Sequence, residues 1–415
     1  MSERDKRIGA LSPEQRRLLE LRLKQRDRAA QGSSEVHSSQ STPTLPARVR
    51  SDALDFSLIF FSTDSDQQAA HKYRPIIEAA RFADQHGFSA VWVPERHFHQ
   101  FGGLYPSPAV LASALAMVTE RIQIRAGSVV LPMHHPARVV EEWSMIDNLS
   151  NGRVGVSFAS GWSPNDFVLR PEAYADRRER LFEAVATVRR LWGGEPLNAE
   201  DGQGQITTVQ VHPRPVQPNL PIWISSTSSS DTCARAGALG ANLLTALLRL
   251  SIDEVAEHIA AYRQALAEHG HDPRSGHVTL MLHTFLGTDL AQVKATVRQP
   301  LMNYLRTYLG VYEQMAAQLN LSSNLAALTE DDKDALVGFA FERYFTTSGL
   351  FGTPESCLVM LDRLQAIGVD EVACLIDFGV PTETMLEGLS HLATLRRLHQ
   401  IRVGSQANQP ERMPQ

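Results

Sequence analysis

The 415-residue chain is expected to be an α/β protein that folds as a (β/α)8 TIM barrel with a helical insertion and a short N-terminal helical appendage. From about residue 54, short apolar runs alternate with amphipathic stretches, the pattern of a parallel sheet built from right-handed crossovers. Eight strands that alternate with helices favour a closed barrel over an open sheet. With 43% hydrophobic residues, the chain can bury a core of that size.

The eight strands are expected at 56–61, 90–93, 122–126, 154–158, 222–224, 242–246, 278–285 and 371–376. Helices are expected at 71–86, 108–119, 136–149, 176–192, 231–239, 252–269 and 354–367. Thr353 followed by Pro354 supplies a cap and a first-turn proline for the last of these helices. Residues 289–350 are helical in pattern but too long for one crossover, so they are predicted to be an insertion that serves as a lid.

The two ends of the chain are expected to lie apart from a barrel over 53–400. Ser12 and Pro13 begin a capped, leucine-striped helix within 1–26, which is a possible docking element. The alternatives are that this helix packs on its own barrel or is disordered. Residues 27–52 are expected to be a flexible polar linker, and 401–415 a disordered tail.

Composition excludes several classes of function. A net charge of -6 offers no basic field, so nucleic-acid binding is not expected. No apolar run approaches the length of a membrane span or a signal peptide, so no membrane association is expected. The three cysteines form neither a disulfide framework nor a metal-binding spacing. We therefore expect a cytoplasmic protein.

The most informative segment follows the second strand. An apolar run at 90–93 leads directly into Glu95, Arg96, His97 and His99. Loops that follow the strands of a parallel barrel carry its reactive side chains, so these four are the predicted catalytic residues. The alternative is an ordinary surface charge cluster.

Small residues follow the third and fourth strands. Gly127 and Ser128 stand at one strand end, and Ala159, Ser160 and Gly161 stand at the other. Small side chains let a flat ligand lie against the backbone, so these five are predicted to contact a cofactor ring. Ordinary tight turns are the alternative.

A hydroxyl-rich run follows the fifth strand. Seven of the eight residues from 225 to 232 carry a hydroxyl group, and they lead into a helix. Amide hydrogens at a helix start, together with hydroxyls, bind phosphate, so Thr227, Ser228, Ser229 and Thr232 are predicted phosphate contacts. Helix capping alone would explain one of them.

Missing motifs narrow the chemistry further. The chain has no phosphate-binding Gly-x-x-x-x-Gly-Lys loop, no Gly-x-Gly-x-x-Gly turn, no Gly-x-Ser-x-Gly elbow and no His-Glu-x-x-His zinc spacing. We therefore expect no metal. A barrel with a phosphate loop and a Glu/His cluster points instead to a bound phosphorylated cofactor that supplies the hard chemistry.

Several motifs resemble one family. Residues 94–98, 130–138, 147–156, 213–224, 352–355 and 368–372, in this order and spacing, closely resemble the bacterial luciferase-like flavin monooxygenases. The resemblance covers nearly everything from 54 to 400. It implies a barrel that binds reduced FMN (FMNH2) and uses O2, with a separate flavin reductase and a homodimeric assembly.

The resemblance also implies roles for individual residues. Gly127 and Ser128 match the strand end behind the flavin ring, at a peptide bond that is often strained or cis. Two positions depart from luciferases themselves: Arg96 stands where they carry a histidine, and Ser160 where they carry an arginine near the phosphate. Light emission from an aldehyde is therefore not expected. His97 and His99 would donate or relay a proton, oriented by Glu95, and Arg96 would hold a substrate oxygen.

A second resemblance concerns the substrate. Residues 11–19 resemble leucine-rich segments that border domains in nonribosomal peptide and polyketide synthases, and the barrel looks closest to the natural-product branch of its family. The hypothesis is a monooxygenase that hydroxylates an acyl or peptidyl chain on a carrier protein, as in antibiotic biosynthesis. Its partner would be that carrier protein or an assembly-line synthase.

Two other functions remain open. One is an oxidoreductase of the same fold that uses the deazaflavin F420 as a hydride carrier. The other is a non-catalytic structural subunit, against which the intact Glu95, His97 and hydroxyl run argue.

Overall fold

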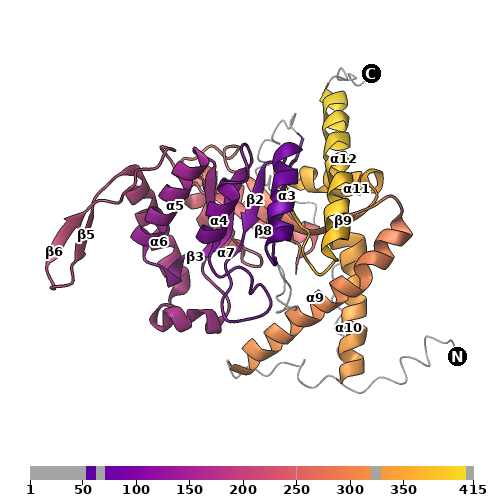
Figure 1. The fold of residues 1–415 in the computed structure, drawn as a ribbon, viewed down its shortest axis with the longest axis horizontal. Coiled ribbons are helices and arrows are strands. Elements are labelled where there is room, and N and C mark those ends of the chain that lie inside the picture. The colour runs from indigo at the N-terminus through magenta and orange to yellow at the C-terminus, as the bar shows by residue number, and fades with distance from the viewer. Residues whose placement is uncertain (1–52, 62–70, 249, 319–328, 408–415) are drawn as a thin grey trace, which may run out of the picture. The chain divides into compact units, whose positions relative to one another are not determined.

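The structure is a computed structural model that describes residues 53–61, 71–248, 250–318 and 329–407. Eight parallel strands form a closed barrel (Figure 1): β1 (Asp55–Ile59), β2 (Ala90–Val93), β3 (Gln123–Val130), β4 (Val154–Ala159), β7 (Ile222–Ser225), β8 (Asn242–Ala246), β9 (Val278–Leu286) and β11 (Glu371–Leu375). Pairing of β8 with β9 and of β11 with β1 closes the ring. All eight expected strands are confirmed.

Helices follow the strands and cover the barrel: α3 (Arg74–Gln85), α4 (Pro108–Ala116), α5 (Pro136–Ser150), α6 (Arg177–Gly193), α7 (Ser230–Ala238), α8 (Ile252–Glu268), α11 (Pro354–Ile367) and α12 (Thr382–Ala407). The seven expected helices are present within a few residues of their expected bounds. Thr353 and Ser356 form the capping box of α11. Among the described residues, no helix is both long and apolar enough to cross a membrane.

One boundary differs from expectation, and the structure contains elements that the sequence did not predict. Helix α12 continues to Ala407, so part of the expected C-terminal tail is helical and the barrel does not end at residue 400. An antiparallel hairpin of β5 (Leu197–Glu200) and β6 (Ile206–Val209) lies between α6 and β7, where no strand was expected. The segments 1–26 and 27–52 and the last residues of the expected tail lie outside the described residues, so the expected docking helix and linker remain predictions.

The expected insertion contains two helices, α9 (Leu290–Gln318) and α10 (Glu330–Arg343), which follow β9 (Figure 1). A π-helical turn, η5 (Tyr344–Ser348), leads from α10 to the short strand β10 (Leu350–Gly352), which pairs with β9. The hydroxyl group of Tyr344 donates to the carbonyl oxygen of Leu248 after β8. That bond fastens η5 to the end of the barrel where the strands finish; the lid role itself remains a prediction.

Glu371 is a fully buried carboxylate in the barrel interior, near the start of the strands. It accepts hydrogen bonds from Trp92 Nε1 at 3.1 Å, from Arg125 Nη1 at 2.8 Å and from the hydroxyl of Ser57, and His277 Nε2 lies 3.1 Å away. Burial acts to raise the pKa of Glu371, but the charges of Arg125 and His277 and these hydrogen bonds hold it well below its usual range. Both carboxylate oxygens of Glu371 are occupied by these groups, so the network links side chains from several strands of the barrel.

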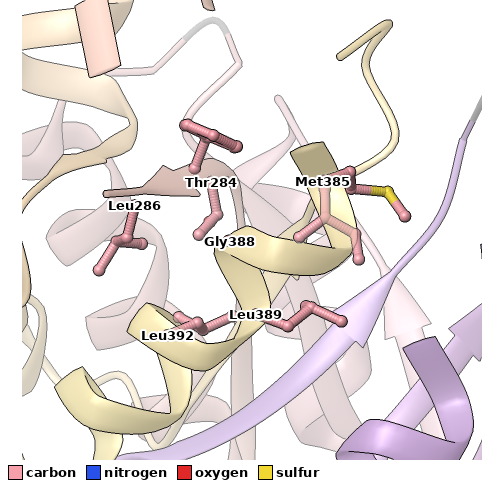
Figure 2. Close-up of a pocket in the computed structure, with 8 residues that line it drawn as sticks. Thr284, Leu286, Met385, Gly388, Leu389 and Leu392 are labelled. Atoms are coloured by element: carbon pink, nitrogen blue, oxygen red, sulfur yellow. The ribbon is translucent and has the colours of Figure 1, made fainter. Parts of the chain in front are cut away.

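A small apolar pocket lies on the outer side of β9, against α12 (Figure 2). Its lining consists of Thr284, Phe285, Leu286, Ile376, Met385, Gly388, Leu389 and Leu392. Thr284 satisfies its own hydroxyl by donating to the Leu282 carbonyl at 3.0 Å. The pocket contains no charged group and lies between the sheet and its helix layer, so it is a packing gap apart from the predicted catalytic residues.

Candidate active site

A carboxylate that holds two imidazoles forms the centre of the site. Glu95 follows β2, and its Oε1 lies 2.9 Å from His97 Nε2 and 2.6 Å from His134 Nε2. Its other oxygen, Oε2, accepts the backbone N–H of Val130 at 2.6 Å. Strand β2 neighbours β3, which brings His134 of the following loop to the carboxylate. His134 was not among the predicted catalytic residues.

The pKa values of Glu95 and His134 shift in opposite directions. Burial acts to raise the pKa of Glu95, but hydrogen bonds from His134 and His97, the charge of His134 and the Val130 amide lower it to about 2. Burial likewise acts to lower the pKa of His134, yet the bond to Glu95 and its charge raise it above the usual value. The carboxylate therefore favours the protonated form of the His134 imidazole.

Arg96 has a different environment from the one expected. Its guanidinium is buried, forms an ion pair with Asp166 and lies 4.7 Å from the ring centroid of Trp162. Asp166 and Trp162 belong to the loop and 3-10 turn η2 (Pro164–Leu169) that follow β4. The ion pair ties the loop after β2 to the loop after β4, while the buried Nε of Arg96 has no hydrogen-bond partner among the described residues, and the expected grip on a substrate oxygen stays a prediction.

His99 also lies apart from the carboxylate cluster. Its Nδ1 accepts the backbone N–H of Phe101 at 2.9 Å, which shapes the turn after β2. Burial and the nearby Arg96 charge lower the pKa of His99. Among the described residues no hydrogen bond or ion pair joins His99 to Glu95, so of the predicted catalytic residues the structure brings together Glu95 and His97.

The end of β3 presents backbone and hydroxyl groups. The Gly127–Ser128 peptide bond is cis, as the family resemblance implied. A Cβ added at Gly127 would lie 3.2 Å from Trp92, so a larger residue would press on that side chain. The hydroxyl of Ser128 lies 3.1 Å from that of Ser157 and 2.6 Å from that of Ser225, which joins the ends of β3, β4 and β7.

The loop after β4 is held close to the barrel. Gly161 has a φ of +79°, and a Cβ there would come within 2.7 Å of Val130 and Phe167, so this position requires glycine. Ala159 and Ser160, just before it, are half-buried. Arg177, at the start of α6, donates from Nε to the Gly161 carbonyl at 3.1 Å. Arg177 brings a positive charge to this loop and was not singled out from the sequence.

The hydroxyl run after β7 divides into two roles. Ser229 is the N-cap of α7 and accepts the amide of Thr232 at 3.2 Å, while Ser226 donates to the Ser229 carbonyl at 2.9 Å. Thr227 and Ser228 are exposed and lie directly before this helix start. Two of the predicted phosphate contacts, Ser229 and Thr232, thus shape the turn, and two present free surface.

These loops follow neighbouring strands β2, β3, β4 and β7, so they meet at one end of the barrel. A flat glycine surface, a group of hydroxyls and a helix N-terminus match what a phosphorylated ring cofactor such as a flavin nucleotide requires. The Arg177 guanidinium lies beside the Gly161 loop at this end of the barrel. The residues present therefore fit the expected cofactor.

Comparison with known proteins agrees with this geometry. The sequence profile of luciferase-like monooxygenases matches residues 55–371. Over 334 residues the chain is 28% identical to "Flavin-dependent trigonelline monooxygenase, oxygenase component" of Acinetobacter baylyi, an alignment that covers 79% of this chain and 90% of that protein.

Two solved structures share the fold. The oxygenating constituent of 3,6-diketocamphane monooxygenase from Pseudomonas putida, in complex with FMN, has a TM-score of 0.65 at 16% identity and covers 84% of this chain and 98% of that one. An F420-dependent secondary alcohol dehydrogenase has a TM-score of 0.60 at 17% identity and covers 83% of this chain and 100% of that one. The family match extends over most of the barrel, so the chain belongs to the luciferase-like monooxygenase family and is a flavin-dependent monooxygenase.

Proposed function

We propose that the chain is the oxygenase of a two-component system, which receives FMNH2 from a separate reductase and adds one atom of O2 to an organic substrate. The second oxygen atom leaves as water, and the reduced flavin supplies the two electrons. The observation that carries this proposal is the Glu95–His134–His97 cluster at the same barrel end as the flat Gly127 surface and the α7 N-terminus. The relative named as an oxygenase component supports the separate reductase.

The protein's own residues would position the cofactor and move protons. Gly127 and Ser128 would lie behind the ring, Ala159, Ser160 and Gly161 beside it, and the hydroxyl run at the phosphate. His97 would donate or accept a proton next to the reacting oxygen, because its Nε2 is held by Glu95 and its side chain is mostly buried. A buried site also keeps water away from the reaction.

A titration of the apo protein tests the cofactor. Reduced FMN and reduced F420 are added separately under nitrogen, and binding is followed by protein fluorescence. Tight binding of reduced FMN, followed by oxygen consumption when air is admitted, is the expected result. Preference for F420 would establish the hydride-transfer alternative, for which a structural neighbour of the same fold gives the precedent. Binding of neither would support a non-catalytic subunit.

For the substrate, we infer an acyl or peptidyl chain on a carrier protein, in the biosynthesis of a natural product. The leucine-rich segment at 11–19 and the resemblance of the barrel to the natural-product branch support this assignment. Incubation with a loaded carrier protein, reduced FMN and air should yield a product heavier by one oxygen atom. A pull-down with and without residues 1–50 tests the docking role, and unchanged association would refute it.

A homodimer accords with exposed apolar side chains on two adjacent helices. Val110 and Met117 on or at the end of α4 are 71% and 69% exposed, and Met145 and Leu149 on α5 are 54% and 50% exposed. Helices α4 and α5 pack side by side. An apolar face of this kind is stabilised by burial against a second copy of itself.

A further inference from the structure

His283 lies on β9 and points away from the helix layer. Thr279, four residues earlier on the same strand, pairs in register with Glu371, whose carboxylate lies in the barrel interior. Side chains four residues apart on a regular strand share a face, so His283 also faces the barrel interior. It pairs in register with Leu375 of β11, near the end where the catalytic loops lie. The side chain is almost fully buried.

Aromatic rings surround this imidazole. Tyr304 of α9 lies 4.8 Å from it between ring centroids, Tyr344 of η5 lies 5.6 Å away and Phe378 lies 5.7 Å away, all in edge-to-face geometry. His283 Nε2 is buried and has no hydrogen-bond partner among the described residues. An unpaired polar atom in apolar surroundings is costly, so a partner outside this set of residues would stabilise it.

The ring is uncharged under ordinary conditions. Burial lowers the pKa of His283 to about 3, so near neutral pH the imidazole offers one N–H donor and one acceptor nitrogen. A neutral imidazole among aromatic rings suits an uncharged hydroxyl or carbonyl group better than a carboxylate, which would lose its hydration without gaining a cation.

We propose that His283 Nε2 is the recognition point of a substrate subsite, where it pairs with a hydroxyl or carbonyl oxygen of an uncharged, largely apolar substrate held among Tyr304, Tyr344 and Phe378. This inference rests on the proposed monooxygenase function and specifies its substrate class. Because the aromatic side chains of α9 and η5 enclose the nitrogen, a ligand reaches it when these side chains move apart. The expected acyl chain, with its carbonyl or hydroxyl groups, belongs to the class.

The test uses three ring probes of similar shape that differ in one group: 4-methylphenol, p-xylene and 4-methylbenzoate. Calorimetry on the full-length protein should show about tenfold tighter binding of 4-methylphenol than of p-xylene, the worth of one buried hydrogen bond. 4-Methylbenzoate should bind most weakly. In His283→Phe the preference for the phenol should vanish. His399→Gln, a substitution of a buried histidine on α12 that bonds the Leu54 amide, is the matched control and should keep the preference.

A measurement on the unaltered protein covers the case in which His283→Phe does not fold. In protein labelled with 15N-histidine, one deeply buried imidazole should stay neutral down to low pH, and its Nε2 resonance should shift with 4-methylphenol and not with p-xylene. Equal affinities for the three probes, no binding of the phenol, or an unchanged resonance would each overturn the proposal. So would evidence of a permanently bound water that keeps Nε2 paired.

Flavin titration separates this inference from the proposed function. If FMN binds and oxygen is consumed but the probes are not discriminated, the His283 subsite is wrong and the monooxygenase assignment stands. If the probes are discriminated in the absence of any FMN binding, the subsite exists in a protein of another function.

Discussion

The carboxylate of Glu95 and the imidazole of His134 approach within 2.6 Å, although they belong to loops after two different strands. The site is therefore formed by residues from the loops after both β2 and β3. The contact also ties the ionisation of one residue to that of the other, which gives the cluster measurable consequences.

Stability should fall in acid in a way that depends on Glu95. The pKa of Glu95 is lowered from 4.5 to about 2 in the folded protein. Ionised Glu95 therefore adds about 3 kcal/mol to the free energy of unfolding. This stabilisation is fully present above pH 4.5 and is lost as the pH falls toward 2. Urea unfolding of Glu95→Gln should therefore show a flatter dependence on pH over this range than wild type. Parallel curves would contradict the assigned charge state.

His97→Ala should fold, bind FMN and lose most product formation. Glu95 keeps its bonds to His134 and Val130 in this variant, so the carboxylate remains paired and the site retains its shape. Flavin affinity measures binding, and the ratio of peroxide released to reduced flavin consumed measures lost product. Turnover near that of wild type would remove His97 from the mechanism.

Asp166→Asn should destabilise the protein strongly. The substitution leaves the buried Arg96 guanidinium without its carboxylate partner. Removing one member of a buried ion pair lowers the free energy of unfolding by about 3–5 kcal/mol. The double variant Arg96→Met with Asp166→Leu should recover much of this stability, because both charges are gone. Chemical denaturation of the three proteins provides the measurement, and a single variant as stable as wild type would show that the pair is solvated.

Gly127→Ala should weaken FMN binding by about tenfold or more, since the added methyl group would press on Trp92 and disturb the surface behind the ring. Gly193→Ala at the end of α6 is the control, because a Cβ there has open space around it. Fluorescence titration of both variants with FMN decides the matter. Equal affinities would mean that the ring lies elsewhere.

Met117→Asp combined with Met145→Asp should convert a dimer into a monomer without altering the barrel. The two charges would be buried if α4 and α5 meet their copies across a two-fold axis. Light scattering after gel filtration gives the mass of each form. Ile401→Asp on α12, at a position equally exposed, should remain dimeric. A monomeric wild-type protein would contradict the proposal.

The sequence predicted the barrel well because its strands have a strong local signature. Runs such as 90–93 are short, apolar and bounded by turn residues, and β2 covers the same residues. The sequence does not predict the β5–β6 hairpin, because the hairpin lacks that signature. Its side chains are mostly exposed, with Ile206 77% exposed, and its two strands pair only with each other. Without a buried face, no apolar pattern marks a strand.

The site was predicted less completely because its contacts join distant positions. Glu95 and His97 lie two residues apart and could be seen as a pair, whereas His134 is 39 positions from Glu95 and meets it only because β2 and β3 are neighbours. For the same reason the sequence shows that Arg96 is charged, but not that Asp166, 70 positions away, neutralises it in the interior. The local sequence pattern shows the type of each residue, whereas the residue that it contacts depends on how the strands pair in the folded sheet.

The bond between Ser57 and Glu371 spans 314 positions and brings the first and last barrel strands together. Contacts of such separation cost more loop-closure entropy than local ones. If Glu371 were buried without Arg125 and Ser57 beside it, its carboxylate would be an unpaired charge in an apolar interior. A closed barrel that lacked β3 would leave Glu371 without the Arg125 guanidinium, so this carboxylate disfavours an incomplete barrel over the native one.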